Sequence, residues 1–166
     1  DAGATDNIIE AASGGTDTIS SAGAGGNIDI TALDFNGTNG ASLSQIEQIV
    51  IDTGRAFEVD AAQVTGLTLN INELAAGTAT LDIDIAGSGA ALDISNFTFT
   101  AAGGNAFDTG ADVIDIDGEA GNNAITGSTL SDTINGAGGD DTIITSGGGD
   151  SVTGGTGADA ITLGSG

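Results

Sequence analysis

An acidic or amide residue recurs at a fixed step of nine near the carboxyl end of the chain. No other feature restricts the fold as strongly. The five positions are Asn123, Asp132, Asp141, Asp150 and Asp159. An aliphatic residue follows two positions after each of them, at Ile125, Ile134, Ile143, Val152 and Ile161. A short repeat of this kind is typical of parallel β architectures in which each unit adds one strand to a stack. The sequence therefore predicts an all-β fold.

Each nine-residue unit divides into a glycine-rich half and a strand of about three residues. The cleanest copy, Gly154–Thr162, reads G-G-T-G-A-D-A-I-T. Glycine tolerates the positive φ angles of a tight turn, so such a loop can direct its carbonyl oxygens inward. A three-residue strand directs one side chain inward, which explains why a single aliphatic residue recurs in each unit. Two units would then form one coil of about 18 residues, with a loop on each side.

Stacked coils would bring the repeated acidic residues together in two columns. Asn123, Asp141 and Asp159 fall on one side, and Asp132 and Asp150 fall on the other. Neighbouring parallel strands lie about 4.8 Å apart, so carboxylates in successive loops repel one another. A divalent cation between the loops would turn this repulsion into attraction. Calcium suits such a site because it binds six to eight carboxylate and carbonyl oxygens.

Residues 118–166 resemble the RTX, or hemolysin-type, calcium-binding repeats of secreted bacterial proteins, and the likeness extends back to Gly110–Ile114. The resemblance implies a right-handed parallel β-helix or β-roll solenoid stabilised by Ca²⁺. Two copies depart from the pattern, since Leu130 replaces a glycine and Asn123 replaces an aspartate, and weaker binding or a purely structural turn is expected there. A fainter echo at Gly14–Ile19 adds Asp17. The implied metal-ligating residues are Asp17, Asp112, Asn123, Asp132, Gly136, Gly139, Asp141, Gly148, Asp150, Gly154, Gly157 and Asp159.

The chain carries 24 acidic residues and a single basic residue, Arg55, which gives a net charge of −23. Such a charge excludes nucleic acid and anionic membrane surfaces as partners and favours cations. It also opposes compaction, so we expect loose structure without divalent cations and cooperative folding with them. Arg55 is expected to pair with Asp52 or Glu58; alternatively, it marks a contact with an acidic neighbouring subunit.

Residues 28–109 lose the nonapeptide but keep a β rhythm, with strand centres every 10–13 residues. Leu81, Ile83 and Ile85 alternate with Asp82 and Asp84, which predicts one inward and one outward face. The same alternation places Leu67, Leu69 and Ile71 inward, with Thr68, Asn70 and Asn72 outside. The predicted strand runs are Ile28–Phe35, Ile46–Asp52, Phe57–Ala61, Leu67–Leu74, Thr80–Ala86, Leu92–Thr100 and Val113–Asp117.

These spacings predict one continuous solenoid with three parts. Residues 1–27 would form an amino-terminal coil with degenerate repeats, residues 28–109 a β-helix with wider coils, and residues 110–166 the calcium roll. Residues 41–48 are expected to form either a helical turn or a lateral strand. The five phenylalanines are expected to fill the wider core. The outward aspartates (29, 82, 84, 93, 115 and 117) are expected to form a solvated face, with weak cation binding as the alternative.

A catalytic function is not expected, because the chain has no histidine, cysteine, lysine or tyrosine to act as base, nucleophile or acid. Paired carboxylates could hydrolyse a glycoside, but structural calcium explains their regular spacing better. A polysaccharide lyase would need basic residues near its substrate, and only Arg55 is present.

The function that these features favour is structural. We expect a secreted, calcium-binding subunit or module of a bacterial surface filament, surface layer or matrix, exported by the type I route that RTX proteins use. The pattern at Leu43–Asp52 looks like repeats of surface-layer and adhesin proteins, or of any acidic β-solenoid. The incomplete last repeat, Leu163–Gly166, suggests an end that receives another coil, so a head-to-tail homo-oligomer is expected. The alternative is an RTX spacer or adhesin module that serves a larger secreted protein or a polysaccharide-acting enzyme. No membrane insertion is expected, because no apolar stretch reaches the ~18 residues of a membrane span.

Overall fold

The computed structural model describes residues 18–20, 28–29, 46–87, 89–101, 105–108 and 111–165. These residues form short β-strands and one four-residue helix, α1 (Ala61–Val64). The strands are β1 (Thr18–Ser20), β2 (Ile28–Asp29), β3 (Gln48–Ile51), β4 (Ala56–Asp60), β5 (Asn70–Glu73), β6 (Thr80–Asp84), β7 (Ala91–Asp93), β8 (Asn105–Ala106), β9 (Val113–Asp117), β10 (Ala124–Thr126), β11 (Asp132–Asn135), β12 (Thr142–Ile144), β13 (Ser151–Thr153) and β14 (Ala160–Thr162).

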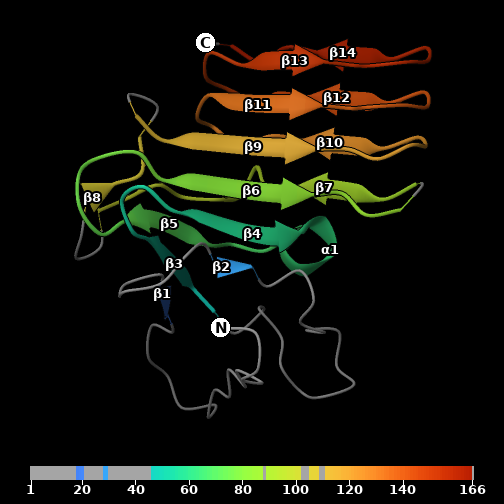
Figure 1. Cartoon of the computed structure of the whole chain (residues 1–166). Helices are drawn as coiled ribbons and strands as arrows, with labels where there is room; N and C mark the ends of the chain where they lie inside the picture. The colour runs from blue at the N-terminus through green and yellow to red at the C-terminus, as the bar shows by residue number, and fades with distance from the viewer. Residues whose placement is uncertain are drawn as a thin grey trace.

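The strands assemble into three sheets, and the strand pairings within them are parallel except for one. The six-stranded sheet has the order β13-β11-β9-β6-β4-β2, and the two four-stranded sheets have the orders β14-β12-β10-β7 and β1-β3-β5-β8. Only β5 and β8 pair in the antiparallel sense among the described strands. Successive strands lie above one another in layers (Figure 1). The predicted all-β class with parallel strands is thus confirmed.

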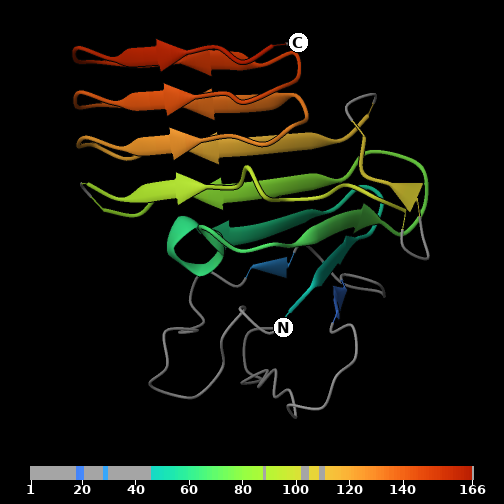
Figure 2. The ribbon, with the colours of Figure 1, turned by 180° about the vertical axis from the view of Figure 1, so that it is seen from behind.

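The carboxyl-terminal strands alternate between two sheets at a step of 18 residues. β9, β11 and β13 belong to the six-stranded sheet, whereas β10, β12 and β14 belong to the sheet behind it (Figure 2). Ala124 pairs with Thr142, which pairs with Ala160. Each residue therefore lies beside the residue 18 positions earlier in the chain, which occupies the same place in its repeat. Loops in equivalent places of the repeat thus stack on one another.

The core follows the predicted alternation. Leu81, Ile83 and Ile85 are fully buried, and their neighbours on β4 and β9 in register continue the same apolar ladder. The nonapeptide aliphatics Ile125, Ile134 and Ile143 are also buried. Ile161 is 44% exposed, because β14 is an edge strand that pairs with β12 alone among the described strands.

Several local features differ from the sequence-based expectation; among them, the strand expected at Leu92–Thr100 is only the short β7, Ala91–Asp93. The strand expected to end at Ala61 ends at Asp60, and α1 follows, with the Asp60 N–H bonded to Gln63 Oε1 (2.8 Å). Asn72 was expected outside but is 1% exposed, because β8 pairs along its strand. β9 matches its predicted run, whereas β5 begins at Asn70, three residues later than expected.

An insertion between β7 and β9 breaks the regular step. Ala79 and Asp112 occupy equivalent places but lie 33 residues apart, and the extra residues fold back against β5. Phe99 and Phe107 meet there with ring centroids 6.0 Å apart, and Phe57, Phe97 and Phe107 are buried as expected. Phe35 and residues 41–45 lie outside the described residues, and β3 begins at Gln48.

Arg55 contacts Asp52, one of its two expected partners, with 3.6 Å between Nε and Oδ2. Over the described ranges, no helix has the length and hydropathy needed to cross a bilayer.

Candidate metal centre

The repeated aspartates act first as acceptors for the backbone of the neighbouring layer. In each case, one carboxylate oxygen accepts the N–H of the residue at the equivalent place one layer earlier. These bonds run from Asn123 N to Asp141 Oδ1 (2.8 Å), from Asp132 N to Asp150 Oδ1 (3.1 Å), from Asp141 N to Asp159 Oδ1 (3.0 Å) and from Ala79 N to Asp112 Oδ1 (2.8 Å). The 18-residue step places Asp141, Asp150 and Asp159 over the chain that each binds, and the insertion lengthens this step to 33 residues for Asp112. Oδ1 therefore has a structural role of its own.

The second oxygens of Asp132, Asp141 and Asp159 each lie beside the glycine five residues earlier in the same loop. A Cβ atom on Gly136 would meet both Asp141 Oδ2 and the carbonyl oxygen of Gly154 at 2.5 Å. A Cβ on Gly154 would likewise meet Asp159 Oδ2, and one on Gly127 would meet Asp132 Oδ2. At Gly136, the missing side chain therefore leaves space for oxygens from two successive loops to converge.

Asp141 is the member of this series whose second oxygen is both buried and without a hydrogen-bond partner among the described residues. Its side chain is 1% exposed, and Oδ2 accepts no hydrogen bond from any described residue. A buried carboxylate oxygen in this state costs free energy of the order of 1–3 kcal/mol or more, because it has lost water and gained nothing. A bound cation would remove that cost.

Asp132 lies on the other side of the stack, and both of its carboxylate oxygens accept hydrogen bonds from a residue of its own loop. Its Oδ2 accepts the Ser128 N–H and its Oδ1 accepts the Ser128 hydroxyl, both at 2.8 Å. Burial raises the pKa of Asp132 to about 7, against the lowering effect of the Ser128 hydrogen bonds. The hydrogen bonds from Ser128 therefore stabilise the buried carboxylate of Asp132, as a bound cation would do at this loop.

Glycines two residues before the repeated aspartates let successive loops touch through their backbones. Gly139 and Gly157 have φ angles of 107° and 139°, and a Cβ on Gly139 would lie 2.4 Å from the carbonyl carbon of Gly121. On the opposite side, a Cβ on Gly148 (φ 98°) would lie 2.3 Å from the carbonyl oxygen of Leu130. Backbone carbonyls of adjacent layers therefore lie close enough to supply ligands alongside a carboxylate.

The structure gathers the sequence-predicted ligands into two groups, one on each side of the stack. One group contains Asn123, Gly136, Gly139, Asp141, Gly154, Gly157 and Asp159; the other contains Asp112, Asp132, Gly148 and Asp150. Asp17 lies outside the described residues. The first group holds the unpartnered oxygen of Asp141, so it is the better candidate for a metal centre.

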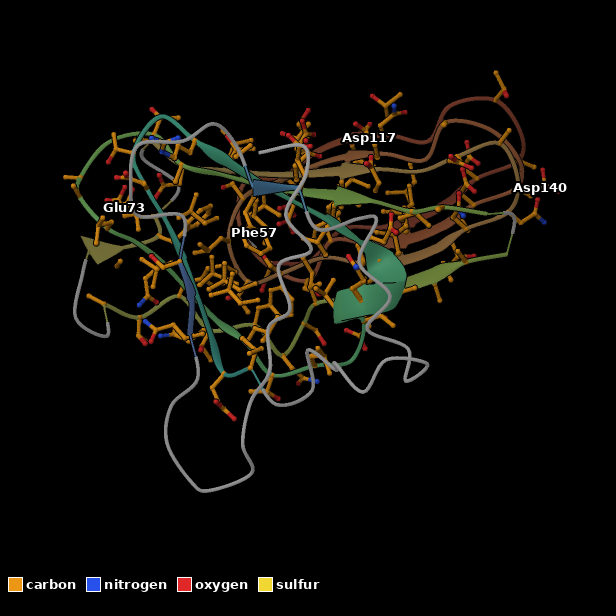
Figure 3. All side chains as sticks on the ribbon, turned by 60° about the horizontal axis from the view of Figure 1, so that its bottom comes forward. Phe57, Glu73, Asp117 and Asp140 are labelled. Carbon is orange, nitrogen blue, oxygen red and sulfur yellow. The ribbon has the colours of Figure 1, made fainter. Side chains whose placement is uncertain are left out.

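A second acidic group lies on the outward face of the six-stranded sheet. Asp82, Asp84 and Asp117 each offer a carboxylate oxygen, and these oxygens lie within 4.8 Å of one another. Asp84 and Asp117 pair in register on β6 and β9, and Asp117 lies among other carboxylates (Figure 3). Burial, followed by the charges of Asp84, Asp115, Glu58 and Asp117, raises the pKa of Asp82 to about 6. This group could hold a metal ion, which is the alternative expected for the outward aspartates.

One buried carboxylate was not anticipated from the sequence. Glu73, the last residue of β5, is 3% exposed, and its Oε2 has no hydrogen-bond partner among the described residues. The signal that could have found it is the alternation of β5, because Glu73 follows Ile71 by two positions and so falls on the inward face.

Comparison with protein-family models, with curated proteins and with solved structures finds no match.

Proposed function

We propose that the chain is a calcium-stabilised parallel β-solenoid and that it serves as a structural protein outside the cell. The observation that carries the proposal is the buried, unpartnered Oδ2 of Asp141 beside the carbonyl oxygen of Gly154. Carboxylate and carbonyl oxygens from two successive loops are the ligands that calcium takes. The glycine positions and the net charge of −23 have the same explanation, since both favour a fold held together by cations.

The donor chemistry favours calcium over other divalent metals. The chain has no histidine or cysteine, which are the ligands that zinc prefers. Magnesium demands near-octahedral geometry and retains several waters, whereas calcium accepts irregular sets of protein oxygens. Extracellular calcium modules bind in the range of about 10⁻⁴–10⁻³ M, which agrees with a role outside the cell.

Strand edges are the surface through which we propose that copies of the chain associate. β13 and β14 are edge strands of their sheets, and each pairs on one side only among the described strands. Ile161 is 44% exposed and Leu163 is 69% exposed on this layer. An open strand edge is a template for another strand. Association of one copy with the next in a head-to-tail manner would give an open-ended fibre, as in a surface filament, surface layer or matrix.

Electron microscopy of the purified chain tests this function. In millimolar calcium we expect fibres or sheets, and in excess chelator we expect their loss. Isolated, monodisperse particles at millimolar calcium would contradict the assembly role while leaving calcium binding open to separate measurement.

A further inference from the structure

Glu73 is an acidic residue in the interior of the structure. Its strand pairs in register with β3, so Ile49 lies beside Ile71 and Ile51 lies beside Glu73. Ile49, Ile51 and Ile71 are all fully buried, and Glu73 continues their inward face. The strand β8 closes the other edge of β5, where Asn105 pairs with Glu73. The Glu73 carboxylate is thereby removed from water.

The loop at residues 74–79 brings a second carboxylate toward Glu73. The Gly77 N–H donates a hydrogen bond to the Glu73 side chain. Two residues later, the Ala79 N–H donates to Asp112 Oδ1, and Asp112 Oδ2 accepts the Asp108 N–H. Both carboxylates thus bind the backbone of one short loop. Asp112 retains unused lone pairs, because a carboxylate offers about four acceptor sites.

The loop at residues 74–79 has no acidic residue of its own. Asp112 accepts the N–H of Ala79, whereas Asp150 accepts the N–H of Asp132, a residue that is itself acidic. Glu73, six residues before Ala79, therefore supplies the carboxylate that lies next to this loop.

The buried carboxylate of Glu73 lies near two other negative charges, those of Asp112 and Asp108. Glu73 Oε2 has no partner among the described residues. Burial, followed by the negative charges of Asp112 and Asp108, raises the pKa of Glu73 above its usual range. A proton on Oε2 would be the competing arrangement, because the resulting O–H could donate to a free lone pair of Asp112 but would leave the charges of Asp112 and Asp108 unbalanced. A cation would satisfy the free oxygen and the neighbouring charges together.

We propose that Glu73 and Asp112 bind a divalent cation, of the oxygen-seeking class of calcium, at the loop of residues 74–79. Glu73 belongs to no nonapeptide, so this site is additional to those of the repeated loops. It lies at the end of the strands opposite the loop that carries Asp140 (Figure 3). Its role is to fasten the insertion that contains β8 and Asp112 to the sheet that contains β5.

The test is the number of calcium ions bound per chain, measured by native mass spectrometry and equilibrium dialysis. Glu73→Gln keeps the size of the side chain and should lower the count by one. Glu47→Gln, which makes the same charge change at an exposed glutamate, should leave it unchanged. An unchanged count in Glu73→Gln, with equal stabilisation of the variant in calcium and in chelator, would show that a proton occupies the site and would overturn the proposal.

A crystal structure of the unaltered chain grown with Mn²⁺ gives a test that does not depend on folding of the variant. We expect an anomalous peak beside Glu73 Oε2; peaks confined to the repeated loops would refute the site. The outcome is separable from that of the proposed function. If the repeated loops bind nothing, Asp141→Asn leaves the calcium count unchanged, whereas Glu73→Gln still lowers it.

Discussion

The two oxygens of Asp141 have different roles. Oδ1 holds the backbone of the preceding layer through the Asn123 N–H, whereas the buried Oδ2 meets no donor among the described residues. The first role needs only an acceptor, and an asparagine can perform it. The second role needs a negative charge and a cation. Substitution of Asp141 by Asn therefore separates the structural role from metal binding.

Asp141→Asn should have opposite effects with and without calcium. In chelator the variant should be more stable, because a neutral amide replaces an unpartnered buried charge. In calcium it should bind about ten- to hundredfold more weakly at this loop, since an interaction with a charged group contributes roughly 1.5–3 kcal/mol. Calorimetric titration and thermal unfolding measure both effects. Asp140→Asn, the same charge change at an exposed neighbour, is the control; equal behaviour of the two variants would contradict the assignment.

Gly136→Ala should destabilise the fold by about 1–3 kcal/mol, the range for an overpacked site. The added methyl group would lie 2.5 Å from the carbonyl oxygen of Gly154 and from Asp141 Oδ2, and the backbone oxygen cannot move aside cheaply. Gly149→Ala is the matched control, because its nearest neighbour, Ser131 Oγ, would lie at 3.4 Å. Urea unfolding in calcium compares the free energy of unfolding of the two variants. If Gly136→Ala loses no more stability than Gly149→Ala, oxygens of two loops do not converge at Gly136.

The sequence pattern predicted which repeated aspartates stack on one another, but it did not predict the buried carboxylate of Glu73. The step of nine identified the aspartates because a strict period fixes which residues stack on which. It could not show that Asp141 is unpartnered while Ser128 satisfies Asp132, since that difference depends on side-chain geometry. Glu73 lies within the predicted strand Leu67–Leu74, but the inward positions were assigned from aliphatic residues alone, which left Glu73 out.

At the scale of elements, the outward face of β4, β6 and β9 places carboxylates side by side. The register aligns Glu58, Asp82 and Asp115 in one row and Asp60, Asp84 and Asp117 in the next. Burial and the neighbouring charges raise the pKa values of Asp82, Asp84 and Asp115. Without cations, this face opposes the fold when it is fully ionised.

Stability in the absence of divalent cations should therefore fall as the pH rises. The pKa of Asp82 is about 6 in the fold against an ordinary value of 3.8, so the folded state binds its proton more tightly. Its contribution is fully present below about pH 4 and is lost as the pH rises through about 6. The β signal in the far-ultraviolet circular dichroism spectrum of the metal-free chain should be larger at pH 5 than at pH 8, with a smaller difference in Asp82→Asn. A β signal that grows as the pH rises under these conditions would contradict this account.

The strands themselves were predictable to different degrees. β6 and β9 follow clean alternation, and their inward residues came directly from the sequence. α1 and the antiparallel β8 were not anticipated. α1 follows β4 without a break, at Ala61, and the two-residue β8 is stabilised by its contact with β5 rather than by a pattern of its own. Short elements that depend on tertiary contacts carry too little local signal to be recognised.

At the scale of the whole molecule, we propose that the edges of β13 and β14 join one copy to the next. Ile161→Asp places a charge at the inward, 44% exposed position of the edge strand β14 without altering the aspartate–glycine loops. We expect the variant to keep its calcium response but to lose association, because an inward-pointing charge on an edge strand blocks addition of another strand. Light scattering in calcium measures this. Asp140→Asn is expected to associate normally, and undiminished association of Ile161→Asp would place the interface elsewhere.

The central claim is that calcium, bound by the stacked carboxylates and carbonyls, holds the parallel strands together. Far-ultraviolet circular dichroism during a calcium titration of the metal-free chain tests it most directly, with magnesium at the same ionic strength as the control. We predict a weakly structured spectrum in excess chelator and a cooperative gain of β signal as calcium is added, with little response to magnesium. A full β spectrum in excess chelator, unchanged by calcium, would contradict the account.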